Sequence, residues 1–386
     1  MDFHFSVYST LLLFGFVQAW IYSLLLWLRG LRQERLADLL LGGVLVALAF
    51  EVWVYMLGFA GIEILWQELN FLPRTLGFLL PPLVYFYLRA QFDRSFRFRG
   101  RHLVHLLPFV VHTGYRVAVY TQGADFVRYW ETMVHYPLVA DLEFVVRTAQ
   151  QLLYLYWSFR LYRGYRGWVE TQFSDTDAID FRWYRNFLIA LTAALFIDLF
   201  VTLLDFQLHL TYWQEWWNSL AGVVLIYYVS IAGYAQGQVA TTLRYDPTEV
   251  AAAPAPAPET VRPPSEALRE LHNYMDREQP YLDADLSLPK LARRLHTNPS
   301  TLSRLINTET GVNFNAFVNT YRVGEFKRRA TGPAGEALGV LAIALDCGFN
   351  SKATFNRVFK QLAGESPKQF IKRMRPDARA GGGEKP

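Results

Sequence analysis

The chain has 386 residues, of which 52% are hydrophobic and 19% are charged, with a formal net charge of +4 and a single cysteine, Cys347. One cysteine excludes a disulfide framework and a cysteine-rich zinc or iron–sulfur site. The high apolar content excludes a wholly disordered chain.

These averages combine two unlike parts of the chain. All 11 tryptophans lie at or before Trp217, and all lysines lie at or after Lys290. Residues 1–246 carry 18 Arg against 19 Asp and Glu, a net charge of −1. Residues 288–375 carry 15 Lys and Arg against 5 Asp and Glu, a net charge of +10. A near-neutral aromatic part joined to a basic part excludes a single soluble globular domain.

The amino-terminal part contains apolar stretches that are long enough to cross a bilayer. About 20 apolar residues in a helix span the roughly 30 Å hydrocarbon core. Seven stretches qualify: Phe5–Leu28, Leu36–Phe59, Phe71–Leu88, His102–Tyr120, Val139–Leu161, Asn186–Phe206 and Trp216–Ala235. We interpret the prolines in the third and fourth stretches as kinks, since neighbouring helices can satisfy the freed carbonyl groups. The sequence therefore predicts a polytopic bundle of seven transmembrane helices over residues 1–246.

The placement of arginine predicts the orientation of this bundle. The connections after the first, third and fifth stretches hold thirteen arginines: Arg29, Arg32, Arg35, Arg89, Arg94, Arg97, Arg99, Arg101, Arg160, Arg163, Arg166, Arg182 and Arg185. The alternate connections hold only Arg74 and Arg128. Because cytoplasmic loops are enriched in positive charge, we expect a multi-pass protein of a bacterial inner membrane with its amino terminus outside and its carboxyl terminus in the cytoplasm. The alternative, a cleaved signal peptide over the first stretch, lacks a basic leader.

Several ionisable residues fall inside the predicted spans. Such groups are costly in hydrocarbon and usually face the bundle interior or a wet cavity. Two interpretations are open: polar contacts between helices, or a cavity that senses a small-molecule or proton signal. The candidate sensing residues are Glu51, Arg116, Glu143, Arg147 and Asp198. Glu143 and Arg147 are spaced to neutralise each other on one helix. His105 and His112 lack a convincing carboxylate partner, so we expect no metal site and no cofactor.

A spacer separates the membrane part from a soluble part. Residues 247–264 read PTEVAAAPAPAPETVRPP, which predicts an extended polyproline-like tether. Fully extended at ~3.1 Å per residue, it would reach roughly 55 Å. We expect a separate soluble domain over residues 265–375 and a disordered tail over residues 376–386.

Two helical hairpins are predicted in the soluble part. In the first, leucines at helical spacing end at a turn over His296-Thr297-Asn298, and Pro299 suits the start of a second helix. In the second, an apolar helix over Leu341–Leu345 ends at Gly348, whose conformational freedom suits a turn, and a further helix follows. Each second helix has an apolar inner face and a polar, Arg-containing outer face. This arrangement is typical of two helix-turn-helix motifs in an all-α domain.

The stretch CGFNSKATFNRVFKQLAGESPKQFIKR closely resembles the second helix-turn-helix of AraC-type transcription regulators. The likeness is carried by Gly348-Phe349, Ser351, Phe355, Phe359-Lys360, Gly364, Ser366-Pro367 and Phe370. LSLPKLARRLHTNPSTLSRLINTETGVNFNAFVNTYR resembles the first helix-turn-helix and the connecting helix of the same family. The resemblance covers about residues 270–375 and implies two recognition helices in successive major grooves. The segment Thr331–Gly339 departs from the family in being rich in small residues.

The outer faces of the two second helices supply the candidate DNA contacts. Arg can pair with guanine, Asn with adenine, and Ser or Thr with either. The candidate base-reading residues are Ser300, Thr301, Ser303, Arg304, Ser351, Lys352, Thr354, Asn356 and Arg357. Basic side chains that would contact phosphates and set the register are Lys327, Arg328, Arg329, Lys360, Lys368, Lys372 and Arg373.

Two classes of function are open. The first is a membrane-bound transcription regulator that senses a small molecule or an envelope signal and binds promoter DNA, as a homodimer and with RNA polymerase as a further partner. The second is a membrane transporter or enzyme with a DNA-binding appendage. The sequence has no HExxH motif, phosphate-binding glycine loop or inverted repeat, so we expect no catalytic residues. A passive membrane anchor is a variant of the first class, although an anchor needs only one helix.

Overall fold

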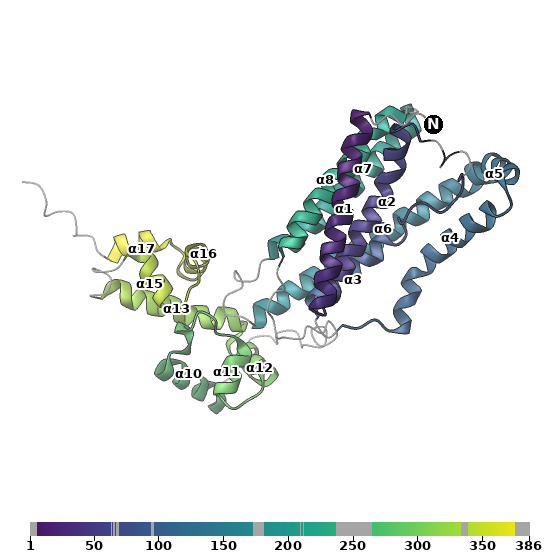
Figure 1. Ribbon diagram of the computed structural model, residues 1–386. Helices are drawn as coiled ribbons and strands as arrows, with labels where there is room; N and C mark the ends of the chain where they lie inside the picture. The colour runs from purple at the N-terminus through teal and green to yellow at the C-terminus, as the bar shows by residue number, and fades with distance from the viewer. Residues whose placement is uncertain are drawn as a thin grey trace, which may run out of the picture. The chain divides into compact units, whose positions relative to one another are not determined.

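The computed structural model describes residues 6–62, 64, 66, 69–93, 96–172, 181–208, 210, 212–236, 265–332 and 339–374. Every regular element in this described part is helical, with no β-strand (Figure 1). The chain forms two compact units, residues 1–163 with 181–246 and residues 164–180 with 247–386. The predicted tether, residues 247–264, and the predicted tail, residues 376–386, lie outside the described residues.

The first unit is built mainly from long helices. In chain order its elements are α1 (Val7–Arg32), α2 (Leu36–Phe59), α3 (Leu80–Phe92), the 3₁₀ helix η1 (Gly100–Leu106), α4 (Leu107–Tyr120), α5 (Ala124–Trp130), the π-helical segment η2 (Glu131–Val139), α6 (Ala140–Gln172), α7 (Phe181–Leu208) and α8 (Tyr212–Ala235). Residues 164–172 of α6 are grouped with the second unit. Helix α1 packs against α2 and α8, α2 also packs against α3 and α8, and α7 packs against α8. Figure 1 shows α1, α2, α7 and α8 side by side as a bundle of long helices.

Four helices among the described residues are long and apolar enough to cross a membrane. They are α1, α2, residues Arg182–Asp205 of α7 and residues Trp216–Ala235 of α8. Helices α3 and α4 have 13 and 14 residues, fewer than the ~20 that a span needs. Helix α6 is long, with 33 residues, but more polar. The interpretation of the prolines as kinks is wrong for Pro81 and Pro82, because they lie in the first turn of α3 and so help to begin this helix. Pro108 lies just after the change from the 3₁₀ helix η1 to α4.

Small residues bring the helices of this bundle into close contact. The Ser23 hydroxyl of α1 donates to the Gly42 carbonyl oxygen of α2 at 2.9 Å, and a Cβ at Gly42 would overlap the Trp27 side chain. Large apolar residues on the other side of α1, including Phe14 and Leu24, are exposed. Small residues inside and large apolar residues outside are the arrangement that helices adopt in lipid.

The second unit contains two apolar cores joined by one helix. Its elements are α10 (Glu266–Glu278), the 3₁₀ helix η3 (Pro280–Leu282), α11 (Leu288–Arg294), α12 (Pro299–Thr310), α13 (Phe314–Thr331), α15 (Val340–Asp346), α16 (Lys352–Ala363) and α17 (Pro367–Met374). Phe314 and Phe317 of α13 belong to the core formed with α10, α11 and α12. Val323 and Phe326 of the same helix belong to the core formed with α15, α16 and α17. Helix α13 therefore sets the spacing between the two cores.

Candidate functional site

Helices α11 and α15 end in turns of the same geometry. The turn residues His296 and Gly348 have positive φ values of 52° and 88°. In each turn the next residue donates its amide to a carbonyl oxygen five positions earlier, at 2.9 Å from Thr297 and 3.2 Å from Phe349. This is the hydrogen bond of a Schellman motif, which closes a helix and turns the chain. The glycine turn was expected from the sequence, whereas the left-handed conformation of His296 was not.

The helices that follow these turns begin and end alike. The Asn298 side chain accepts a hydrogen bond from an amide in the first turn of α12 at 2.7 Å, and Ser351 does the same in α16 at 3.2 Å. Each helix has 12 residues and ends at a glycine with positive φ. Arg304 and Arg357 each lie six residues after the capping residue. The two arginines therefore occupy the same position on two equivalent helices.

Most of the candidate base-reading side chains lie on the surface. Exposed members on α12 are Ser300, Thr301 and Arg304, and exposed members on α16 are Lys352, Asn356 and Arg357. Ser303 and Ser351 are half-buried. The opposite faces pack inward through Leu302 and Ile306 on α12, and through Phe355 and Phe359 on α16. Both helices thus present a polar face that includes one arginine.

The side chains of Ser351 and Thr354 form hydrogen bonds at the first turn of α16. The Thr354 side chain is buried, with 2% of the residue exposed, and its hydroxyl lies 2.8 Å from the Ser351 hydroxyl. The Ser351 side chain accepts from the Thr354 amide. Both side chains are therefore placed to cap the helix rather than to reach a base edge.

The candidate phosphate contacts differ in how they are held. Arg328 and Arg329 both donate to the Glu325 carboxylate, at distances of 2.5–2.8 Å. These bonds, above all those from Arg328, lower the pKa of Glu325. The Arg329 guanidinium also donates to the Asp346 carbonyl oxygen at the end of α15. The Glu325 carboxylate thus keeps the guanidinium groups of Arg328 and Arg329 against the surface of α13.

Other candidate phosphate contacts lie near α16 and α17. The Lys327 ammonium is 5.7 Å from the ring centroids of Phe359 and Phe370, and Arg373 pairs with Glu365 at 2.6 Å. Lys360, Lys368 and Lys372 are exposed. A cavity of about 360 Å³ beside α16 is lined by Lys352, Asn356, Lys360 and Lys368, together with apolar residues of α15 and α17. Three lysines, Lys352, Lys360 and Lys368, therefore line one cavity next to the candidate base-reading face.

Cys347 lies in the turn after α15 and is fully buried. Burial raises the pKa of its thiol to about 11. Cys347 is therefore a small buried core residue of this turn.

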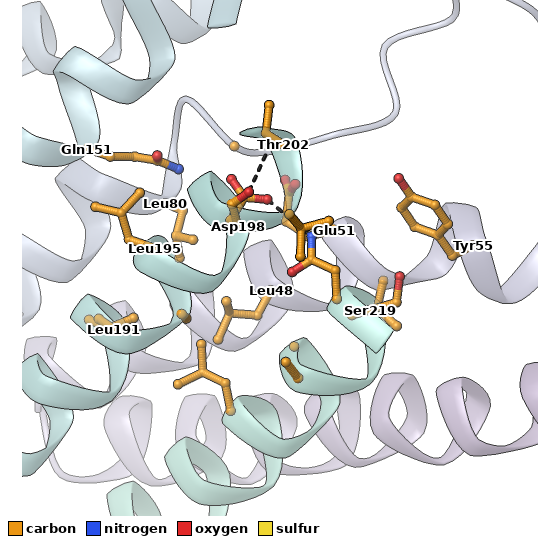
Figure 2. A pocket seen from close by; sticks show the side chains of 18 of the residues that line it. Leu48, Glu51, Tyr55, Leu80, Gln151, Leu191, Leu195, Asp198, Thr202 and Ser219 are labelled. Atoms are coloured by element: carbon orange, nitrogen blue, oxygen red, sulfur yellow. Dashed lines mark hydrogen bonds between the residues drawn. The ribbon is translucent and has the colours of Figure 1, made fainter. Parts of the chain in front are cut away.

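The candidate sensing residues of the first unit fall into two places. Glu51, Arg147 and Asp198 line one pocket, together with Asp205 and Asn218 (Figure 2). Arg116 instead lies over the Phe71 ring, 4.0 Å from its centroid. Glu143 pairs with His112 at 3.0 Å rather than with Arg147. His105 contacts the Tyr154 hydroxyl. No group of three or more His, Cys, Asp or Glu side chains in the described ranges could hold a metal ion.

Comparisons with known proteins find a family match, which lies in the second unit, and several partial relatives. Residues 291–373 match the family model described as a helix-turn-helix domain. An uncharacterised HTH-type transcriptional regulator of Bacillus subtilis (strain 168), YtdP, is 32% identical over 93 residues, which are 24% of this chain and 12% of that protein. Another of Staphylococcus aureus (strain COL) is 32% identical over 101 residues, 26% of this chain and 13% of that protein. A solved structure of a protein of unknown function from Listeria innocua is 27% identical, covers 28% of this chain and 98% of its own, and has a TM-score of 0.25.

This chain thus spans about an eighth of the length of those two regulators. The likeness lies within the part of the chain that contains both helix pairs, and it identifies a helix-turn-helix domain in the second unit.

Proposed function

We propose that this chain is a membrane-bound transcription regulator whose second unit binds promoter DNA sequence-specifically. The observation that carries the proposal is the equivalence of α12 and α16: each follows the same turn, begins with the same kind of cap and exposes an arginine at the same position. A helix that follows such a turn and presents polar side chains is the form in which helix-turn-helix proteins read the major groove. The helix-turn-helix family match and the names of the two regulators support it.

In the proposed interface α12 and α16 are the two recognition helices. Arg304 and Arg357 contact guanine edges, and Asn356 contacts adenine. Ser300, Thr301, Ser303 and Lys352 complete the base-reading face. Lys360, Lys368 and Lys372 contact phosphates, while Lys327, Arg328, Arg329 and Arg373 add positive charge nearby. We leave Thr354 and Ser351 out of the base-reading set because their hydroxyl groups cap α16.

The membrane part of the proposal rests on the four long apolar helices and on exposed apolar surface elsewhere in the first unit. Val110 and Val111 of α4 and Val145 and Leu152 of α6 are all exposed. Large apolar side chains on the outside of a helix are favourable in lipid and unfavourable in water. We therefore propose that the continuous run of η1 and α4 (residues 100–120), α6 and the region of α3 join the four helices to give seven crossings. The arginine asymmetry then places the carboxyl terminus in the cytoplasm.

In this scheme the first unit senses a signal, and two copies of the chain bind two half-sites of a promoter, where RNA polymerase is a further partner. A ligand that prefers one packing of the bundle would shift its population and change the geometry of the paired DNA-binding units. A transporter or an enzyme with a DNA-binding appendage is the second candidate function. The proposal assigns no catalytic step to the chain.

Genome-wide mapping of bound DNA in cells that contain the full-length chain tests the proposal. We expect discrete promoter peaks that disappear in the Arg304→Ala, Arg357→Ala double variant. Reporter fusions after residue 246 test the membrane part and should be active in the cytoplasm only. A chain that washed vesicles release without detergent, or a fusion active only outside the cytoplasm, would contradict the membrane part. Absence of specific peaks would contradict the DNA-binding part.

A further inference from the structure

A cavity of about 360 Å³ lies inside the first unit. Its lining comes from several helices, with Glu51 on α2, Arg147 on α6, Asp198 on α7 and Asn218 on α8. The volume falls within the range of about 300–1,000 Å³ that is usual for small-molecule sites. A charged cavity among apolar helices is costly unless something compensates it.

The charges in this cavity do not balance. Its lining contains three carboxylates, Glu51, Asp198 and Asp205, and one guanidinium, Arg147. Asp205 already accepts a hydrogen bond from the Leu210 amide at 2.8 Å. Glu51 Oε1 is buried and has no hydrogen-bond partner in the described part of the chain. Arg147 is therefore the one positive group among the described residues of this lining, close to both Glu51 and Asp198, and the carboxylates outnumber it.

Arg147 neutralises this cavity only in part. Its Nη2 lies 3.9 Å from Asp198 Oδ2, which is beyond hydrogen-bonding distance. Asp198 Oδ1 accepts a hydrogen bond of 3.2 Å from the Asn218 side chain. One oxygen of Asp198 and one of Glu51 thus remain available to a donor with a positive charge.

The cavity also has an apolar side. Leu48, Leu191 and Leu195 line it together with the carboxylates. Figure 2 shows Leu191 and Leu195 on one side of Asp198 and Tyr55 on the other. An occupant that matches this lining has a cationic head and a short apolar chain.

We propose that this cavity binds a small amphipathic amine in its protonated form. The ammonium group lies between Glu51 and Asp198, and the apolar chain packs against the leucines of α2 and α7. This inference rests on the proposed function, in which the first unit senses a small molecule, and it names the class of ligand. Because the ammonium group and Arg147 compete for Asp198, binding weakens the ion pair between α6 and α7. That change is a differential contact through which a ligand shifts a bundle between two packings.

The first test uses the unaltered full-length chain in lipid nanodiscs and three probes of equal chain length. These are n-octylammonium, octanol and octanoate, titrated by calorimetry with empty nanodiscs as the blank. We expect saturable binding of n-octylammonium and binding of the other two that is at least about tenfold weaker, since a desolvated charge pair contributes this much or more. Equal or tighter binding of octanoate, or no saturable binding of n-octylammonium, would overturn the inference.

The second test uses variants that keep the side-chain size. Glu51→Gln and Asp198→Asn should each weaken n-octylammonium binding at least about tenfold, because each removes one charge of the pair. Arg147→Gln should strengthen it, since the competing cation is removed. Glu143→Gln is the matched control, because this carboxylate lies in the same unit but pairs with His112 outside the cavity. A loss with Glu143→Gln equal to that with Glu51→Gln, or weaker binding with Arg147→Gln, would contradict the assignment.

DNA binding by the same nanodisc samples separates this inference from the proposed function. If n-octylammonium fails to bind while the chain still selects promoter DNA, the ligand assignment is wrong and the proposed function stands. If the amine binds but the chain selects no DNA, the proposed function fails and the amine site stands.

Discussion

Arg322 Nε donates a hydrogen bond of 2.8 Å to the main-chain carbonyl oxygen of Tyr281. The Arg322 side chain is fully buried, and its Nη2 also donates to the Asp283 carbonyl oxygen at 2.9 Å. Tyr281 belongs to the core beneath α12, whereas the Arg322 guanidinium lies 5.8 Å from the ring of Phe349 in the core beneath α16. One side chain in the middle of α13 therefore connects the two halves of the second unit.

Replacing Arg322 by Met should lower the free energy of unfolding of residues 265–386 by about 2–4 kcal/mol. The change removes hydrogen bonds from a charged donor and leaves the buried Tyr281 carbonyl oxygen and the part-buried Asp283 carbonyl oxygen without it. Urea denaturation followed by circular dichroism measures the loss. The matched control is Arg277→Met, since Arg277 is exposed and pairs with its neighbour Glu278. An Arg322 variant that unfolds at the same urea concentration as the control would show that this connection contributes nothing to stability.

The corresponding arginines of α12 and α16 should each contribute to base selection. We expect Arg304→Ala and Arg357→Ala to weaken binding to the preferred site by ~1–3 kcal/mol each and to relax the preference at one position. Fluorescence anisotropy with the preferred site and with random duplexes measures both effects. Lys372→Ala is the control, because loss of a phosphate contact should weaken both duplexes alike and reduce the salt dependence. If the arginine variants behave like the lysine variant, the arginines contact phosphates instead.

The hydroxyl groups at the start of α16 should affect stability rather than base preference. Ser351→Ala removes the oxygen that accepts from the Thr354 amide, and Asn298→Ala removes its counterpart in α12. Each change should lower the free energy of unfolding by about 1 kcal/mol and leave the selected DNA sequence unchanged. Thr354→Ser keeps the hydroxyl group and should leave the selected sequence unchanged, while loss of the buried methyl group should lower the free energy of unfolding. A shift in the selected sequence with Thr354→Ser would restore Thr354 to the base-reading face.

Much of the second unit could be predicted from its sequence because local signals agree there. The sequence predicts the turn at Gly348 because glycine adopts positive φ without strain. The structure adds a second reason for glycine at this position, since a Cβ here would overlap the Tyr281 carbonyl oxygen. Pro299 was correctly read as the start of a helix. The left-handed conformation of His296 could not be predicted, because histidine adopts positive φ more often than most non-glycine residues but still only rarely. The conformation is imposed by the turn between α11 and α12.

The buried polar groups could not be predicted, because burial depends on contacts between distant segments. Arg322 has the same residue type and helical setting as Arg328, yet Arg322 is fully buried and the Arg328 side chain is 69% exposed. The polar contacts inside the first unit could not be predicted either. Glu143 and Arg147 have the spacing of a helical pair, but Glu143 contacts His112 of α4 and Arg147 contacts Asp198 of α7. Residue spacing gives the neighbours along one helix, whereas the packing of helices decides which contact forms.

The thiol of Cys347 should report on the opening of the core beneath α16. The residue is fully buried, and burial raises its pKa to about 11, so both access and the thiolate fraction are low at neutral pH. We expect a thiol reagent to react with native residues 265–386 far more slowly than with the urea-unfolded chain. The Arg322→Met variant should react faster than the unaltered chain in the absence of urea. Rapid reaction of the native, unaltered chain would contradict the closed core.

Glu325 should make the stability of the second unit depend on pH. Its pKa lies below the ordinary value of 4.5, chiefly because Arg328 donates hydrogen bonds to its carboxylate. The unfolded chain therefore takes up a proton before the folded chain does as the pH falls. The stabilisation is fully present above about pH 4.5, the unfolded pKa, and is lost as the pH falls through the lower folded pKa.

The Glu325→Gln variant isolates this contribution. At pH 7 it should be less stable than the unaltered chain, because Arg328 and Arg329 lose a charged acceptor. The difference should shrink as the pH is lowered below 4.5, since protonation then weakens the same acceptor in the unaltered chain. Urea denaturation of residues 265–386 at a series of pH values measures it. Arg373 offers the control: Arg373→Gln removes an exposed pair with Glu365 and should leave the pH profile almost unchanged. A constant difference between Glu325→Gln and the unaltered chain from pH 7 to pH 3 would show that the charge of Glu325 does not stabilise the fold.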